Sequence, residues 1–128
     1  MAEMTIKKRP KNLDLTTIRL PLPGKVSILH RVSGVGLFLF LPVLLWLFSA
    51  SLGSADTFAA FRSVFSSLPA KVVLAGLLWA FVHHFCAGIR FLLLDLHIGI
   101  EKEPARKSAA VVFAVSIPLT LILWGILL

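Results

Sequence analysis

The sequence predicts an all-α membrane protein with three transmembrane helices and a short interfacial segment at the N-terminus. Hydrophobic residues make up 58% of the 128 residues, and the mean hydropathy is +0.93, whereas soluble domains are about 45–50% apolar. The excess lies in three long blocks without Asp, Glu, Lys or Arg, and a helix needs about 20 mostly apolar residues to cross the hydrocarbon core. None of the blocks alternates with a period of two, which argues against a membrane barrel.

Residues 1–25 are predicted to form a cytoplasmic and interfacial segment, and residues 26–128 to form the membrane anchor. The segment Pro21–Gly24 is predicted to be a turn because it holds two prolines and a glycine. Ser27 is the expected start of the first span, and residues 12–18 are expected to rest against lipid headgroups or a partner. This N-terminal segment is too short to form a soluble catalytic domain. Any chemistry is therefore expected to take place in the bilayer or on a partner.

The first span is predicted over residues 26–52, and an outer loop is expected to begin at Ser54. Asp56 and Thr57 both favour the start of a helix, because a short side-chain oxygen can accept a hydrogen bond from a free backbone N–H group. Either residue is therefore expected to cap a short helix that runs through Phe65.

The second span is predicted over residues 69–97, and the third over 106–128, with an inner turn at 101–104 between them. Pro42 and Pro118 lie inside spans, where neighbouring helices can satisfy the freed backbone groups. The third span holds few polar side chains, and a structural role is expected for it.

The 13 Lys and Arg residues, which give a formal net charge of +7, are distributed unevenly around the predicted spans. Seven precede the first uncharged block: Lys7, Lys8, Arg9, Lys11, Arg19, Lys25 and Arg31. The first loop has only two, Arg62 and Lys71. Four lie around the second loop: Arg90, Lys102, Arg106 and Lys107. Basic residues accumulate on the cytoplasmic side of membrane proteins. The N-terminus is therefore expected in the cytoplasm and the C-terminus outside, and the charge favours anionic lipid or an acidic partner over nucleic acid.

Ser27 and Arg31 lie four residues apart, so both project from one helix face at the predicted inner membrane edge. A quinone carries two carbonyl acceptors on an apolar ring and tail, and a pair of donors at this depth matches its head group. The alternative is that Ser27 caps the helix while Arg31 extends to the interface.

His84 lies on a stripe with Gly76, Ala80 and Gly88, which recur every four residues in the second span. Small residues on both sides leave room for a flat cofactor bound through an imidazole nitrogen. Alternatively, the small residues only let two helices approach, and His84 forms a hydrogen bond across their interface. His83 points about 100° away from His84 and is the secondary candidate, in more crowded surroundings.

His30 is expected at the membrane edge, whereas His84 precedes His97 by 13 residues, a rise of up to about 20 Å. His30 is therefore expected to contact a cofactor's polar periphery, and a second axial ligand for a haem would come from another polypeptide. Asp95 lies near the His84 face at the inner boundary, where it could accept a proton or pair with Arg90 or Arg31.

Three elements together resemble the cytochrome b membrane-anchor subunit of bacterial succinate dehydrogenase. They are Arg9-Pro-Lys-Asn-Leu-Asp-Leu15, Ser27-Ile-Leu-His-Arg-Val-Ser-Gly34, and His84-x-x-x-Gly-Ile-Arg90 followed by Asp95. The similarity covers nearly the whole chain, and the elements are specific in combination.

The resemblance implies a four-subunit complex of the bacterial inner membrane. In it a flavoprotein oxidises succinate, an iron–sulfur subunit relays electrons, and two hydrophobic anchors bind ubiquinone and haem b. It also implies that Ser27 and Arg31 line the quinone site, that His84 is an axial haem ligand, and that His30 and Arg31 approach the haem propionates. The second anchor would supply the other axial histidine.

Members of the family often carry a histidine where this chain has Phe91, so a propionate contact made by that histidine is missing here. Two alternatives remain at this stage. One is the anchor of a fumarate reductase, which runs the reaction in reverse, and the other is a non-redox structural or transport protein with three membrane helices.

Overall fold

The computed structural model describes residues 10–11, 14 and 16–127, and its helices in this part are α1 (Leu22–Gly53), α2 (Ala55–Ser66), α3 (Leu68–Asp95) and α4 (Lys102–Leu127). The three long helices are each apolar and long enough to cross a membrane. No strand occurs in the described part of the chain. The predicted all-α fold with three candidate membrane spans is confirmed.

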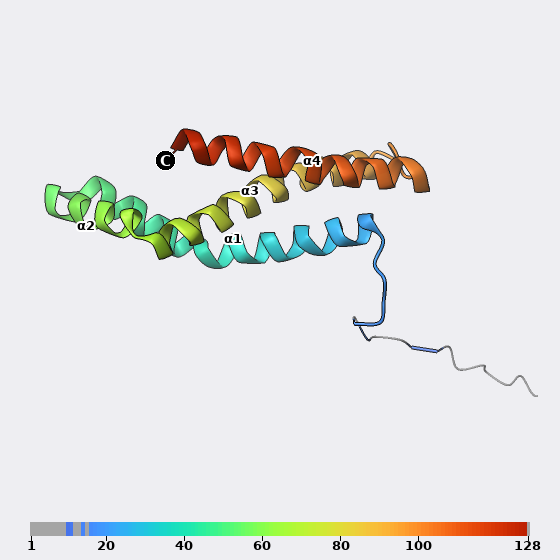
Figure 1. Ribbon diagram of the computed structural model, residues 1–128, viewed down its shortest axis with the longest axis horizontal. Helices are drawn as coiled ribbons and strands as arrows, with labels where there is room; N and C mark the ends of the chain where they lie inside the picture. Colours follow the sequence, from blue (N-terminus) through green and yellow to red (C-terminus); the bar gives the residue numbers. More distant parts are fainter. Residues whose placement is uncertain (1–9, 12–13, 15, 128) are drawn as a thin grey trace, which may run out of the picture.

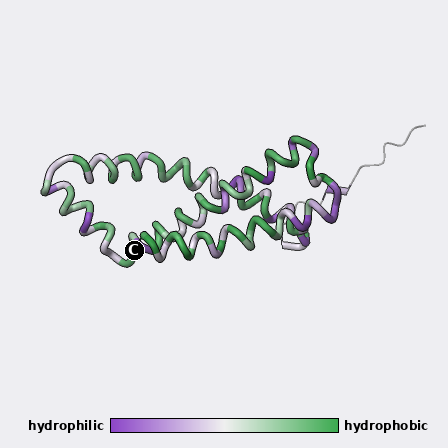
Figure 2. The backbone as a smooth tube through the Cα atoms, turned by 90° about the horizontal axis from the view of Figure 1, so that it is seen from above, coloured by the Kyte–Doolittle hydropathy of each residue, from purple (hydrophilic) through white to green (hydrophobic). Residues whose placement is uncertain are grey.

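Helix α3 lies between α1 and α4 and packs against both, and α2 lies at the end where α1 passes into α3 (Figure 1). The start of α1, the end of α3 and the start of α4 share the opposite end of the bundle. Figure 2 shows hydrophobic residues along most of each long helix, with hydrophilic residues at this shared end and also at the α2 end and where the helices cross. A small core of Val26, Ala87, Ala109 and Val112 joins the three helices, while many large apolar side chains on their outer faces are exposed, as expected of surfaces that meet lipid.

Two proline-containing segments that were expected to be turns belong to helices instead. Helix α1 begins at Leu22, with Pro23 in its first turn, and α4 begins at Lys102, with Pro104 in its first turn. The first turn of a helix tolerates proline because its N–H groups have no partner within the helix. The predicted turn at Pro21–Gly24 is therefore wrong, and the helix that holds the first candidate span begins five residues before Ser27.

Ser54 is the N-cap of α2, where Asp56 or Thr57 was expected. The Ser54 hydroxyl accepts a hydrogen bond from the Thr57 N–H group at 3.2 Å. In return, the Thr57 hydroxyl accepts one from the Ser54 N–H group at 2.7 Å. This reciprocal pair satisfies two donors at once and places the cap one residue before Ala55.

Helix α3 ends at Asp95, two residues before the predicted end, because His97 adopts a left-handed conformation with φ of 60°. The Ile98 N–H group donates to the Leu93 carbonyl at 3.0 Å, and the His97 N–H group donates to the Leu94 carbonyl at 2.9 Å. These bonds form a Schellman motif, which closes the helix and starts the turn toward α4.

Part of the predicted interfacial segment is described. The Asp14 carboxylate accepts hydrogen bonds from the Thr16 N–H group at 2.9 Å and from the Thr16 hydroxyl at 2.6 Å. These donors favour the charged form and hold the pKa of Asp14 below its usual value. Asn12, Leu13 and Leu15 of the same segment lie outside the described residues, and whether the segment rests on headgroups stays a prediction.

Candidate functional site

The rings of His30 and His84 stack where α1 crosses α3. Their centroids are 4.1 Å apart and their planes differ by 9°. The predicted wide separation of these two residues is wrong. Because α1 begins at Leu22, His30 lies about 12 Å along the helix rather than at its first turn.

The hydrogen bonds of His84 determine which of its nitrogens carries the proton. Nδ1 lies 2.9 Å from the carbonyl oxygen of His30, and since a carbonyl only accepts, Nδ1 must donate. The lone pair of neutral His84 is therefore on Nε2. Metal-binding histidines commonly use this arrangement, in which a backbone carbonyl fixes the tautomer and the orientation of the ring.

Ser33 supports this arrangement and was missed in the sequence. It is 7% exposed, its hydroxyl donates to the His30 carbonyl at 3.0 Å, and it lies 3.2 Å from Nδ1 of His84. The sequence did hold a signal for this role of Ser33. Ser33 follows His30 by three residues, and a serine at that spacing in a helix can reach the backbone carbonyl one turn back.

Gly34 allows α1 to approach the His84 ring. A Cβ atom at this position would lie 2.8 Å from Cε1 of His84, closer than real contacts allow. On the other helix, a Cβ atom at Gly88 would lie 3.6 Å from Nε2 of His30, an ordinary contact. The expectation of open space on both sides of His84 is wrong, since the His30 ring covers one of its faces.

His83 occupies a different environment between α3 and α4. It is 0% exposed, and its ring lies 5.2 Å from that of Trp79 and 5.3 Å from that of Phe113, centroid to centroid. Neither ring nitrogen has a hydrogen-bond partner among the described residues. His83 is therefore packed between two aromatic side chains, on a different side of α3 from the His30 contact of His84.

Ser27 and Arg31 share one side of α1, with Ser27 half-buried and Arg31 exposed. Since α1 begins five residues before Ser27, this serine is not the helix cap that the alternative interpretation required. Asp95 is exposed at the last residue of α3. The structure therefore places Ser27 and Arg31 on one helix, while Asp95 is at the end of another.

Arg90 was assigned to the second loop region but is 6% exposed within the helix bundle. Its Nε donates to the Ser108 hydroxyl at 2.9 Å, and its Nη2 donates to the Ala105 carbonyl at 3.1 Å. These bonds attach α3 to the start of α4 and leave Arg90 unpaired with Asp95. The burial of Arg90 could not be predicted from its spacing in the sequence, because both of its hydrogen-bond partners lie at the start of another helix.

The arrangement fits one axial bond to a haem iron from this chain. The described residues contain no group of three or more His, Cys, Asp or Glu side chains that could hold a metal ion. His30 lies against the face of the His84 ring, out of line with the Nε2 lone pair, so it is not placed to bind the opposite side of the same iron.

Comparisons with known proteins agree on one family. A family model described as "Succinate dehydrogenase/Fumarate reductase transmembrane subunit" matches residues 5–123. The chain is 33% identical over 122 residues to the succinate dehydrogenase cytochrome b556 subunit of Paracoccus denitrificans, covering 95% of this chain and 94% of that protein. It is 37% identical over 110 residues to the subunit of the same name from Coxiella burnetii, covering 85% and 88% of the two chains.

Proposed function

The chain belongs to the succinate dehydrogenase/fumarate reductase transmembrane subunit family, and from this membership we propose that it anchors a succinate dehydrogenase complex and binds haem b and ubiquinone. The resemblance inferred from its motifs is thereby confirmed. In the proposal, a flavoprotein partner oxidises succinate and an iron–sulfur partner delivers the electrons. The chain itself supplies binding groups in the membrane and does not oxidise succinate.

The hydrogen bond from Nδ1 of His84 to the His30 carbonyl carries the haem proposal. It orients the ring and keeps the Nε2 lone pair available as one axial ligand, and a second anchor subunit supplies the other. Bound haem b provides a one-electron carrier inside the bilayer. His30, whose ring stacks on the His84 ring, and the next residue, Arg31, are proposed to contact the propionates.

Ubiquinone is proposed to bind at Ser27 and Arg31, with the Ser27 hydroxyl donating to a quinone carbonyl. Arg31 then favours the negative charge that develops on the oxygen during reduction. Neither side chain forms a hydrogen bond or an ion pair within the described part of the chain, so both donors are available to a ligand. Asp95 is a secondary candidate for proton transfer at the same membrane boundary.

The positions of the basic residues favour an inner-membrane protein with its N-terminus in the cytoplasm and its C-terminus in the periplasm. A reporter that is active only in the cytoplasm should work when fused to the N-terminus and fail when fused after Leu128. A reporter active only in the periplasm should give the reverse pattern. A cytoplasmic C-terminus would contradict this orientation.

Gly34→Ala should lower the haem content of the purified complex by about tenfold, because changes that move a metal ligand typically cost 10–100-fold in metal affinity. The added methyl group would meet Cε1 of His84 at 2.8 Å, and the stacked His30 ring limits how the imidazole can move away. Haem per assembled complex is measured from the alkaline pyridine spectrum.

Gly36→Ala is the matched control, since a Cβ atom there meets nothing within 4 Å. It should keep the wild-type haem content. Equal haem in both variants would show that the contact of Gly34 with His84 does not position a ligand.

The family includes fumarate reductase anchors, so fumarate reduction is the second candidate direction of the proposed reaction. A purely structural or transport role is the candidate from another class. A reduced-minus-oxidised haem b spectrum of the purified complex supports either redox anchor, and its absence favours the structural role.

A further inference from the structure

Arg90 carries a buried charge that the described residues do not neutralise. Its guanidinium has five N–H donors, and two of them bond to Ser108 and Ala105. It forms no ion pair with any carboxylate in the described part of the chain, the nearby Glu101 and Glu103 included. A buried cation in a membrane bundle is costly unless an anion or further acceptors accompany it.

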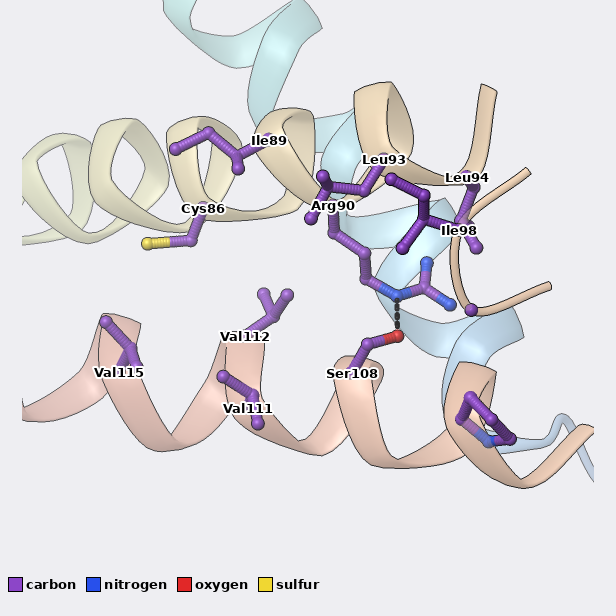
Figure 3. Close-up of a pocket in the computed structure, with 12 residues that line it drawn as sticks. Cys86, Ile89, Arg90, Leu93, Leu94, Ile98, Ser108, Val111, Val112 and Val115 are labelled. Carbon is purple, nitrogen blue, oxygen red and sulfur yellow. Dashed lines mark hydrogen bonds between the residues drawn. The ribbon is translucent and has the colours of Figure 1, made fainter. Parts of the chain in front are cut away.

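The remaining donors of Arg90 adjoin an apolar groove between α3 and α4 (Figure 3). The groove encloses about 450 Å³, within the range of about 300–1,000 Å³ typical of ligand sites. Its walls include Ile89 and Leu93 on α3 and Val111 and Val115 on α4, all of which are exposed on the bundle surface. A charged end and a long apolar wall therefore occur in one surface groove.

Arg90 lies close to the ends of the two helices that form the groove. It precedes the end of α3 at Asp95 by five residues, and its partner Ser108 follows the start of α4 at Lys102 by six. These spacings place the Cα atoms of Arg90 and Ser108 about 7–9 Å inside the helix ends. From there the groove runs toward Val115, seven residues or about 10 Å further along α4.

We propose that this groove binds one anionic phospholipid, with the phosphate on Arg90 and an acyl chain between α3 and α4. A phosphate accepts two N–H groups of a guanidinium side by side, and basic pockets between helices on the cytoplasmic side suit anionic headgroups. A quinone lacks the negative charge that Arg90 requires. A carboxylate from a partner subunit is the rival occupant of this site, and the test below distinguishes it from a lipid.

The exposed charges at the start of α4 carry a small positive excess, with Lys102, Arg106 and Lys107 against Glu101 and Glu103. Arg106 and Lys107 lie on α4 beside this end of the groove and are exposed. They disfavour a choline headgroup, whose positive charge would face theirs, and they favour a lipid with net negative charge. The inference rests on Arg90 and the α3–α4 groove, independently of the haem and quinone residues.

The test uses the intact complex, purified in detergent, washed free of loosely held lipid and examined by native mass spectrometry. Dioleoylphosphatidylglycerol or dioleoylphosphatidylcholine is then added back. The wild-type complex should retain or rebind one phosphatidylglycerol in preference to phosphatidylcholine. Arg90→Gln should weaken this binding by roughly tenfold, as expected when a charge-assisted contact is lost.

Val111→Trp fills the groove from its exposed wall and leaves Arg90 intact. It therefore tests lipid binding in the groove even where Arg90→Gln prevents assembly of the complex. It should also lose the tightly held lipid, whereas Arg106→Gln on the exposed surface should keep it. The proposal is overturned by wild-type lipid binding in both groove variants, by equal binding of the two lipids, or by a wild-type complex that holds no phospholipid there because a partner carboxylate pairs with Arg90.

Discussion

Replacing His84 with Leu should abolish the low-spin haem b spectrum of the purified complex, the largest effect expected of any single substitution in this chain. Leucine is similar in size but has no lone pair to bind iron. The His30 carbonyl and the Ser33 hydroxyl would remain in place and lose their imidazole partner. The spectrum should therefore disappear even where the proposed complex still assembles.

His83→Leu is the matched control, because it changes the adjacent histidine in the same helix. His83 is enclosed by Trp79 and Phe113, and both its nitrogens lack partners in the described residues. Removing a buried polar group without a partner should relieve a penalty of about 1–3 kcal/mol. This variant should keep its haem spectrum and be at least as stable as the wild type; a lost spectrum here and a retained one in His84→Leu would assign the ligand to His83.

Ser27→Ala and Arg31→Leu should each lower electron transfer from succinate to ubiquinone by roughly tenfold or more. Removing a donor that a bound carbonyl requires costs about 1–3 kcal/mol, and each 1.36 kcal/mol on a barrier is tenfold in rate. Electron transfer from succinate to an artificial dye that accepts upstream of the membrane should survive, because the proposal assigns succinate oxidation to a flavoprotein partner. The measurement compares the two activities in the same preparation.

Ser51→Ala is the control for Ser27, since it removes a serine near the other end of α1 whose hydroxyl bonds to the Phe48 carbonyl of its own helix. It should leave quinone reduction unchanged. Arg31→Leu is also expected to shift the haem spectrum if its guanidinium reaches a propionate, while Ser27→Ala should not. Normal quinone reduction in Ser27→Ala and Arg31→Leu, with an assembled complex, would remove both residues from the quinone site.

Hydropathy sufficed to predict the three spans, because lipid requires long apolar helices whatever their packing. The ends of the helices were harder to predict. Pro23 and Pro104 suggested turns, although each lies in a first turn that tolerates it. Helix α3 ends because His97 adopts a left-handed conformation. Glycine usually occupies that position, so a histidine there gave no sign of the helix end in the sequence.

The candidate site was predictable in its residue types but not in its contacts. A histidine in a stripe of small residues was interpreted either as room for a flat cofactor or as a close helix approach with a hydrogen bond across it, and the structure shows the second. The stacking of His30 on His84 and the contact with Gly34 depend on where α1 crosses α3. Sequence spacing along one helix does not determine that crossing. The burial of Arg90 was equally beyond prediction from spacing along one helix, because its hydrogen-bond partners Ser108 and Ala105 belong to α4.

Purifying the complex from membranes through a tag on this chain tests the central claim most directly. The preparation should contain a flavoprotein, an iron–sulfur protein and a second hydrophobic subunit, together with haem b, and it should reduce ubiquinone when succinate is added. Recovery of the chain without these redox partners, or of a complete assembly that cannot pass electrons between succinate and a quinone, would contradict the account.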